Sequence, residues 1–293
     1  MSPLWWIWSA FFLLECVVAI YLNSYIVFFN GRSLTEGGKR NPVSLILIIM
    51  GINNITMRCI WIVNDVAFWL TDIFDSPLYN AVAFLLGFHM YFNYWLAAWL
   101  CVYYTIFIAN FSHRMFLWIK RNLLAFLNQV LFVTGVGSLA ISLLALMWRC
   151  TVIVNNSANG TTIEDVSITY FYKIGAIILG SCLPFTCIAI SLMVSVSSLL
   201  KHVNNLSQTG FDVQVHVTLI KSMTVFFMIS VSYFLVYIIN LTAVFKLKDP
   251  LHCIIWLLIV LAPTMKSIII IQASPKMRKN FPGWFCARGT GGQ

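Results

Sequence analysis

Seven long apolar runs follow one another along the chain, separated by shorter stretches that hold most of the charged residues. A transmembrane helix needs about 20 apolar residues, and each run reaches that length. The predicted spans are residues 6–30, 43–70, 78–109, 122–147, 171–200, 218–245 and 251–273. The pattern predicts an all-α membrane protein, a seven-transmembrane-helix bundle forming a single domain over residues 1–293, with residues 274–293 as its tail.

Prolines mark where several of these helices begin. A capping side chain followed by proline at the first helical position leaves no N–H unsatisfied there. This pair opens the second, third and seventh spans, at Asn41-Pro42, Ser76-Pro77 and Asp249-Pro250. Ser274-Pro275 repeats it and predicts a short helix along the membrane surface, where the following cations meet lipid headgroups. Pro184 and Pro263 fall inside spans five and seven and predict kinks.

The composition and the placement of charge support this interpretation. Apolar residues make up 60% of the chain and charged residues 9%, against about 45–50% and about 25% in soluble domains. Most lysines and arginines fall on one side of the predicted spans, so the amino terminus is expected outside and the tail in the cytoplasm. The net charge of +9 is then a topology signal, and no nucleic-acid partner is expected. The basic residues of the cytoplasmic side are Arg32, Lys39, Arg40, Arg114, Lys120, Arg121, Lys201, Lys221, Lys276, Arg278, Lys279 and Arg288, against Arg149, Lys173, Lys246 and Lys248 outside.

The sequence offers little that is typical of an enzyme or a cofactor site. It has no cysteine and histidine cluster with zinc spacing, no glycine-rich phosphate loop and no paired carboxylates within a span. We therefore expect no catalytic site, no metal and no cofactor. Five of the eight cysteines lie within spans, and a bridge between Cys150 and Cys253 near the outer span ends stays open.

Residues 104–121 carry the most specific local pattern, YTIFIANFSHRMFLWIKR, in which an apolar helix runs into a basic segment. It resembles the end of the third membrane helix in the type 2 (bitter) taste receptors, roughly F-Y-F-L-K-I-A-N-F-S-H-x-x-F-L-W-L-K. Further resemblances lie at Ser198 to His202, His216 to Lys221, Tyr233-Phe234 and Ser267. Together they cover nearly the whole chain.

The resemblance implies a plasma-membrane G-protein-coupled receptor. It would bind small bitter compounds outside and promote nucleotide exchange on a heterotrimeric G protein, of the gustducin or Gi-like class, inside. The chain departs from the family pattern in span two, where Asn53-Asn54 stands in place of an S-R pair and Arg58 lies about one turn away, and at Lys266, which replaces a histidine. A vomeronasal type 1-like pheromone receptor and a small-molecule or ion transporter are the alternatives, although internal repeats typical of transporters are missing.

Aromatic stripes and one carboxylate are the candidate ligand contacts. Tyr91, Trp95 and Trp99 recur every four residues and share one helical face. The resemblance favours Trp95 and Tyr233 as ligand contacts, whereas stripes of this kind also simply pack a bundle. Asp65, inside span two, is predicted either to attract cationic ligands or to pair with an outer lysine. The complete candidate set is Trp95, Tyr233, Asp65, Trp99, Tyr237, Trp256, Tyr91 and Asn240.

Three more charged residues lie deeper in the spans, where an unpaired charge is costly. Glu15 and Arg58, in neighbouring spans, are expected to pair. Lys266 is expected near Asn23, Asn54 or water. A lysine in the seventh span also permits a retinal Schiff base, but span three has no carboxylate to serve as counterion.

Two surface features complete the predictions. A basic, histidine-bearing cytoplasmic surface is expected to grip the G protein, although topology alone also explains its charge. Its residues are His113, Lys120, His202, His216 and Lys221. In the second outer loop, Asn155 and Asn159 begin acceptor sequences for N-glycosylation.

Overall fold

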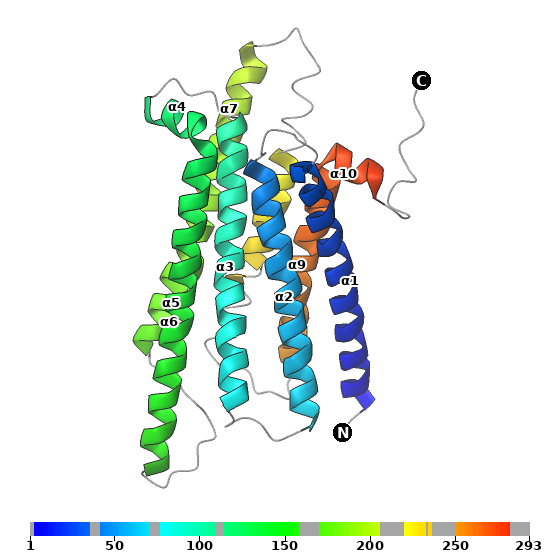
Figure 1. Cartoon of the computed structure of the whole chain (residues 1–293), viewed down its shortest axis with the longest axis vertical. Coiled ribbons are helices and arrows are strands. Elements are labelled where there is room, and N and C mark those ends of the chain that lie inside the picture. The colour runs from blue at the N-terminus through cyan, green and yellow to red at the C-terminus, as the bar shows by residue number, and fades with distance from the viewer. Residues whose placement is uncertain are drawn as a thin grey trace.

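The computed structural model describes residues 3–35, 42–70, 77–108, 114–158, 170–205, 220–232, 234–235 and 250–281, and the regular structure in these ranges is helical (Figure 1). The amino-terminal half consists of α1 (Pro3–Thr35), α2 (Pro42–Leu70), α3 (Pro77–Ile108), α4 (Arg114–Arg121) and α5 (Leu123–Ala158). The remainder consists of α6 (Tyr170–Ile177), a π-helical turn η1 (Ile178–Cys182), α7 (Leu183–Asn205), a helix at Ile220–Ser232, α9 (Pro250–Ala273) and α10 (Pro275–Asn280).

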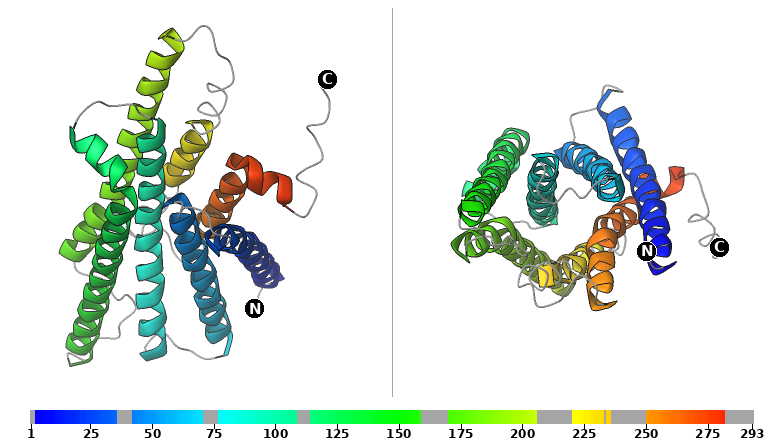
Figure 2. Two further views of the ribbon diagram at one scale, coloured as in Figure 1. Left: turned by 45° about the horizontal axis from the view of Figure 1, so that its top comes forward. Right: turned by 90° about the horizontal axis from the view of Figure 1, so that it is seen from below.

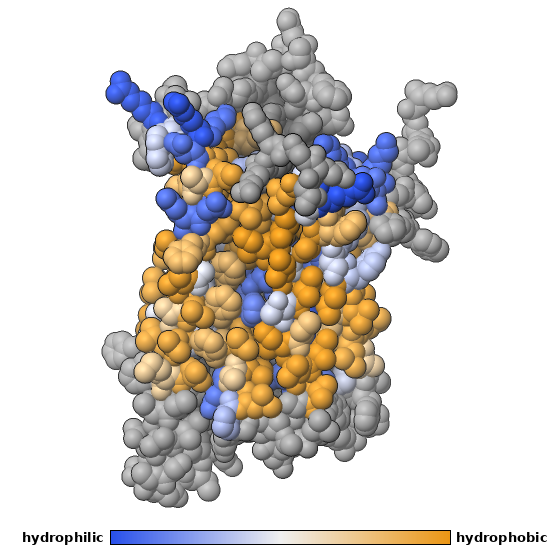
Figure 3. Space-filling view, viewed as in Figure 1, coloured by the Kyte–Doolittle hydropathy of each residue, from blue (hydrophilic) through white to orange (hydrophobic). Residues whose placement is uncertain are grey.

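The lengths and composition of these helices fit a bilayer. Within the described residues, five helical stretches are long and apolar enough to cross a membrane, and Ile220–Ser232 and Val260–Ala273 are shorter apolar helices. A broad apolar belt covers the face of the molecule that Figure 3 shows, and polar side chains gather at the end where α4 and α10 lie. Large apolar side chains such as Phe28, Phe132 and Ile190 are exposed on α1, α5 and α7. They face the position that lipid occupies.

Proline sets the helix starts as predicted. Helices α2, α3 and α9 begin at Pro42, Pro77 and Pro250, and the capping residues before them lie outside the described residues. The predicted surface helix is present as α10, where the Ser274 side chain accepts a hydrogen bond from the Met277 N–H at 3.4 Å. Figure 1 shows α10 turning away from the direction of α9 at the end of the bundle.

Two stretches depart from the predicted spans. Helix α5 has 36 residues and continues to Ala158, so at 1.5 Å per residue it is about 54 Å long and its last turns project beyond a hydrocarbon core of about 30 Å. Asn155 therefore lies in the final turn of a helix and not in a loop, while Asn159 lies outside the described residues. Residues 114–121, expected as part of a loop, form α4.

The fifth span accommodates Pro184 through a local change of helix type. The Leu183 N–H donates to the carbonyl of Ile178, five residues back, which closes the π-helical turn just before the proline. A proline lacks the N–H that an α-helix would use at this point. The structure thus has a π-helical turn where the sequence predicted a kink. In α9, by contrast, Pro263 lies inside a continuous helix.

Helix α3 is the central helix of the described bundle. It packs against α2, α5 and α7, while α1 packs against α2 and α9 (Figure 2). Leu96, Ala97 and Leu100 of α3 are buried in the main apolar core. Two glycines permit close approaches: a Cβ at Gly51 would lie 2.6 Å from Val27 Cγ2, and one at Gly180 would lie 2.4 Å from the Tyr91 ring.

The contact between η1 and α3 predicts a difference between two nearby glycines. Gly180→Ala should lower the free energy of unfolding by about 1–3 kcal/mol, because the added methyl group overlaps the buried Tyr91 ring. Gly175→Ala is the matched control, because a Cβ at Gly175 has nothing within 4 Å. Thermal unfolding of the purified protein in detergent measures both. Equal stability of the two variants would contradict the packing described here.

Candidate functional site

Buried polar side chains gather inside the bundle, on α1, α2, α3 and α9. Lipid offers no hydrogen bonds, so such groups need partners within the protein. They form two layers, an outer one around Arg58 and an inner one around Asn54. The buried members are Glu15, Asn23, Asn54, Arg58, Asn93, Thr264, Lys266 and Ser267.

The outer layer, here called the outer polar junction, consists of Glu15, Arg58, Thr264 and the Val260 carbonyl. Arg58 Nη2 lies 2.8 Å from Glu15 Oε1, and the two residues are 1% and 5% exposed. The same nitrogen donates to the Val260 carbonyl, and the Thr264 hydroxyl donates to Glu15 Oε1. The predicted Glu15–Arg58 pair is therefore confirmed, and it extends to α9 on both sides of Pro263.

A small apolar cluster packs beside this junction. Phe12, Cys16 and Val260 form its buried part, with Trp61 and Ile62 packed against them. The Phe12 and Trp61 rings meet edge to face, with their centroids 6.3 Å apart. Since Phe12 precedes Glu15 by about one turn, and Trp61 follows Arg58 by about one turn, these rings cover the junction on the side of the predicted outer surface.

The inner layer, the asparagine network, joins four helices. Asn54 Nδ2 donates to Asn23 Oδ1 at 3.0 Å, and the Ser267 hydroxyl donates to the same oxygen at 3.0 Å. Asn93 Nδ2 donates in turn to Asn54 Oδ1. Asn23 and Asn54 thereby tie α1 and α2 to α3 and α9. Asn54, one of the two amides at the departure from the family pattern in span two, is thus a hydrogen-bonded centre of the bundle.

Lys266, which was expected near Asn23, Asn54 or water, lies on α9 next to Ser267. The Ser267 hydroxyl donates to Asn23 Oδ1. The Lys266 Nζ lies over two aromatic rings, 5.6 Å from the centre of Tyr94 and 5.4 Å from that of Phe226. Ring faces attract cations, most strongly when the site is desolvated. Lys266 therefore links α9 to α3 and to the helix at Ile220–Ser232.

The aromatic face of α3 makes helix-packing contacts. Trp95 stacks on Trp99 with centroids 6.0 Å apart, and Trp99 meets Phe126 of α5 edge to face at 6.3 Å. Tyr91 is buried against Gly180 of η1, whereas Trp95 is only partly buried. The structure brings the three residues onto one side of α3, facing α5 and η1. Asn93 and Tyr94 lie on another side, toward α2 and α9.

Asp65 is partly buried on α2 and comes seven positions after Arg58. Seven residues are about two helical turns, so Asp65 lies on the same face as the outer polar junction and nearer the outer end. The lysines predicted as its partners, Lys246 and Lys248, lie outside the described residues. So do Tyr233, Tyr237 and Asn240, and the side chain of Trp256.

The predicted cytoplasmic surface is described in part. Lys120, in the last turn of α4, and Lys221, in the first turn of the helix at Ile220–Ser232, are exposed. His113, His216 and the side chain of His202 lie outside the described residues. The described ranges contain no group of three or more His, Cys, Asp or Glu side chains that could hold a metal.

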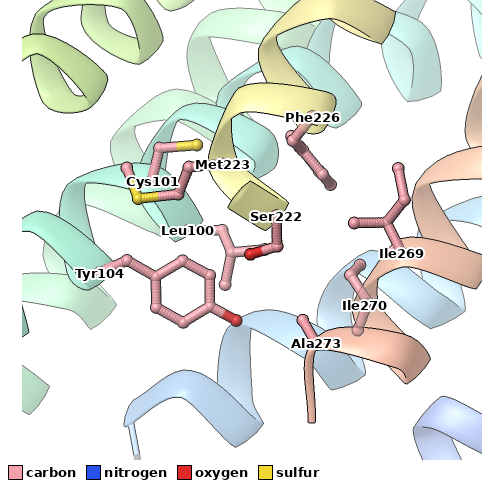
Figure 4. A pocket seen from close by; sticks show the side chains of 9 residues that line it. All are labelled: Leu100, Cys101, Tyr104, Ser222, Met223, Phe226, Ile269, Ile270 and Ala273. Atoms are coloured by element: carbon pink, nitrogen blue, oxygen red, sulfur yellow. The ribbon is translucent and has the colours of Figure 1, made fainter. Parts of the chain in front are cut away.

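A cavity that the sequence did not indicate lies between the predicted cytoplasmic ends of three helices (Figure 4). Its wall is apolar except for Tyr104 and Ser222, and Phe226, which faces it, also contacts Lys266. These side chains look like ordinary packing residues in the sequence, which explains why they were missed. The lining residues are Leu100, Cys101 and Tyr104 of α3, Ser222, Met223 and Phe226, and Ile269, Ile270 and Ala273 of α9.

Comparison with known proteins gives matches over nearly the whole chain. The sequence model of the family described as taste receptor protein (TAS2R) matches residues 2–288. Taste receptor type 2 member 8 of Gorilla gorilla gorilla is 29% identical over 284 residues, which are 91% of each chain. The Homo sapiens member 8 is 28% identical, with the same coverage of both chains. Taste receptor type 2 member 134 of Rattus norvegicus is 24% identical over 310 residues, covering 96% of this chain and 88% of its own.

The outer polar junction predicts strong coupling between its two charges. Glu15→Leu and Arg58→Met should each lower the stability by about 3–5 kcal/mol, because each leaves an uncompensated charge buried in the bundle. The double variant removes both charges, so its loss should be well below the sum of the two single losses. Thermal unfolding of the four proteins gives this coupling energy directly. Additive losses would contradict the pairing.

Proposed function

The chain belongs to the taste receptor (TAS2R) family, so it is a multi-pass bitter taste receptor that acts through a G protein and has no enzymatic role, and we propose which of its residues receive the agonist and which carry the signal. The observation that carries the proposal is the outer polar junction, because it joins α2, which holds Asp65, to α9 at Pro263. Membership of this family sets aside the vomeronasal and transporter alternatives.

The agonist site is proposed in the outer half of the bundle, along α2 and α3. Asp65 supplies a carboxylate whose attraction for a cation is stronger in a poorly hydrated pocket than in water. Trp95 is the aromatic contact on α3, with Tyr91 and Trp99 supporting it from the turns before and after. The opposite wall of the agonist site is proposed to consist of aromatic and amide residues, namely Tyr233, Tyr237, Asn240 and Trp256. Such a mixture of apolar walls and few polar groups is typical of small-molecule pockets.

The signal is proposed to run along α9. Arg58 holds α9 at the Val260 carbonyl, and Lys266 lies half a turn beyond Thr264. Lys266 lies over Phe226, and Phe226 lines the cavity between the cytoplasmic ends. A shift of α9 at the junction therefore reaches the cavity wall through two contacts. An agonist drives this shift only as far as it binds the two arrangements with different affinity.

The G protein is proposed to enter at that cavity. In the structure the cavity is small and its wall is mostly apolar, so it suits the apolar face of an inserted helix once the surrounding helices separate. Exposed Lys120 and Lys221 stand near the predicted cytoplasmic ends, and His113, His202 and His216 are proposed to complete the contact surface. A gustducin or Gi-like subtype is proposed on the family resemblance. Glycosylation at Asn155 and Asn159 stays a prediction.

The agonist site predicts a charge-dependent effect of Asp65. Asp65→Asn should weaken the potency of cationic agonists by about tenfold, the effect of 1.4 kcal/mol, and leave neutral agonists nearly unchanged. Trp95→Ala should weaken both classes, because it removes apolar contact area. The measurement is the half-maximal concentration of each agonist in a bitter-compound panel, in cells that express the variant with a promiscuous G protein.

Surface expression must be equal across the variants, and Asp65→Glu serves as the matched control because it keeps the charge. Equal loss of potency for cationic and neutral agonists would make Asp65 a structural residue. Unchanged agonist potency in Trp95→Ala would show that the agonist pocket does not include this part of α3.

The cytoplasmic surface predicts a separation of binding from coupling. His113→Ala combined with Lys120→Ala should lower agonist-stimulated nucleotide exchange severalfold while agonist binding is retained, because the predicted topology puts both residues on the cytoplasmic side and the proposed agonist site in the outer half. Arg32→Ala, which removes an exposed cation at the end of α1, is the control. Nucleotide exchange on purified G protein is the measurement. A wild-type rate of nucleotide exchange in the double variant would show that this surface does not take part in G-protein coupling.

A further inference from the structure

Three buried hydroxyl side chains join α3 to α7 close to the cytoplasmic cavity. Thr105 lies in the last turn of α3, directly after Tyr104 and one turn after Cys101, which both line the cavity. It faces Ser191 and Ser195 of α7, and the three hydroxyl residues are 9%, 5% and 0% exposed. Water therefore does not compete for their hydrogen bonds.

The Thr105 hydroxyl has acceptors on both helices. Its Oγ1 lies 3.0 Å from the Ser191 carbonyl oxygen and 3.0 Å from Ser195 Oγ, which are both on α7. It also lies 2.9 Å from the Cys101 carbonyl oxygen, on its own helix. Ser195 Oγ donates to the Ser191 carbonyl, four residues back along α7, at 2.8 Å. The Thr105 proton is thus the one that joins the two helices at this point.

The alternative acceptor on α3 makes this connection reversible. Breaking a buried hydrogen bond usually leaves a polar group unpaired, which costs more than the net value of the bond. Here the Thr105 hydroxyl can turn to the Cys101 carbonyl when α7 moves away. Ser195 keeps the Ser191 carbonyl in either arrangement. No hydroxyl of the three-residue cluster that donates in the structure is left without an acceptor, so the helices can separate here at low cost.

A movement of α7 would also change the wall of the cavity. The Phe185 ring of α7 stacks on the Phe227 ring of the helix at Ile220–Ser232, with centroids 5.2 Å apart. That helix supplies Met223 and Phe226 to the cavity, opposite the residues of α3. Helix α7 continues beyond the end of α3 on this side of the molecule (Figure 1). Release of α7 from α3 would therefore let both of these helices move outward and widen the cavity.

We propose that Thr105 is a releasable latch, whose hydroxyl holds α7 on α3 in the resting receptor and transfers to the Cys101 carbonyl when the cytoplasmic end opens. The proposal rests on the proposed entry of the G protein at the cytoplasmic cavity. Thr105 is a positioning residue in this scheme, because it acts through α7 and touches neither the agonist nor the cavity. The latch limits nucleotide exchange in the absence of agonist.

The first test measures nucleotide exchange on purified G protein, with the full chain in lipid nanodiscs and no agonist. Thr105→Val removes the hydroxyl at nearly constant size and should raise the basal rate about threefold, the factor expected for one hydrogen bond between membrane helices. Ser195→Ala should raise it less, because the Ser191 carbonyl still accepts from Thr105. The double variant should match Thr105→Val, because both substitutions act on the same connection.

Two controls separate the latch from a general loss of buried hydroxyl groups. Thr105→Ser keeps the hydroxyl and should restore the wild-type rate. Thr134→Val combined with Ser138→Ala is the matched pair, because these residues equal Thr105 and Ser195 in burial and donate to carbonyls of α5 itself. This pair should leave the basal rate unchanged. An equal rise in the control pair, or a lower rate in Thr105→Val, would overturn the proposal.

The second test follows the helices without a G protein. Spin labels are introduced as noncanonical amino acids in place of Phe107 and Ser197, which are exposed near the ends of α3 and α7, so the eight native cysteines stay. Pulsed electron paramagnetic resonance should show more of the long label distances in Thr105→Val than in the wild type or Thr105→Ser.

The two tests separate a failure of the latch from a failure of the proposed function. Wild-type label distances in Thr105→Val would overturn the latch, whatever the exchange rate. Longer distances with an unchanged rate of exchange would support the latch and overturn the proposed entry of the G protein at the cavity.

Discussion

An arginine held inside the hydrocarbon part of a membrane protein must be paired, and this requirement fixes how three helices of the bundle meet. Arg58 is 1% exposed, and its guanidinium is shared between Glu15 of α1 and the Val260 carbonyl of α9. A proline weakens the hydrogen bonding of the helical turn before it. The guanidinium thus supplies a donor to α9 close to Pro263, where backbone donors are scarce. Helix α9 consequently cannot move at this level without disturbing a buried charge.

The asparagine network and Lys266 connect α9 to the rest of the bundle a second time, about one turn beyond the outer polar junction. Amides such as Asn23 and Asn54 pair without the large desolvation cost of ions, so they can exchange partners at lower cost than the outer polar junction. The outer polar junction is thus a rigid ionic contact, and the asparagine network is an adjustable neutral one. Lys266 adds a further contact of α9, because its ammonium group lies over the aromatic rings of Tyr94 and Phe226.

The sequence predicted those features that depend on composition and on local rules. Pro42, Pro77 and Pro250 begin helices because proline is best tolerated there. Glu15 and Arg58 were expected to pair because a buried charge needs a partner and they lie in neighbouring spans. The ring contacts of Lys266 with Tyr94 and Phe226 were not predicted, because no sequence pattern fixes the rotation of α9. The cytoplasmic cavity was missed because Leu100, Met223 and Ile270 are ordinary apolar residues whose meeting depends on tertiary packing. Tyr233 and Tyr237 lie outside the described residues, so the second aromatic wall stays a prediction.

The π-helical turn at η1 has a consequence for insertions and deletions in related sequences. A π-turn arises when one residue is added to an α-helix, and the added residue rotates the remainder of the helix by about 100°. Compared with one continuous α-helix through α6 and α7, the π-helical turn therefore makes the α6 side chains point in different directions. Loss of one residue between Ile178 and Cys182 would convert the turn to α-helix and present another set of α6 side chains to the bundle. A single-codon deletion at this point is therefore a route by which relatives can alter which residues face the bundle without any substitution.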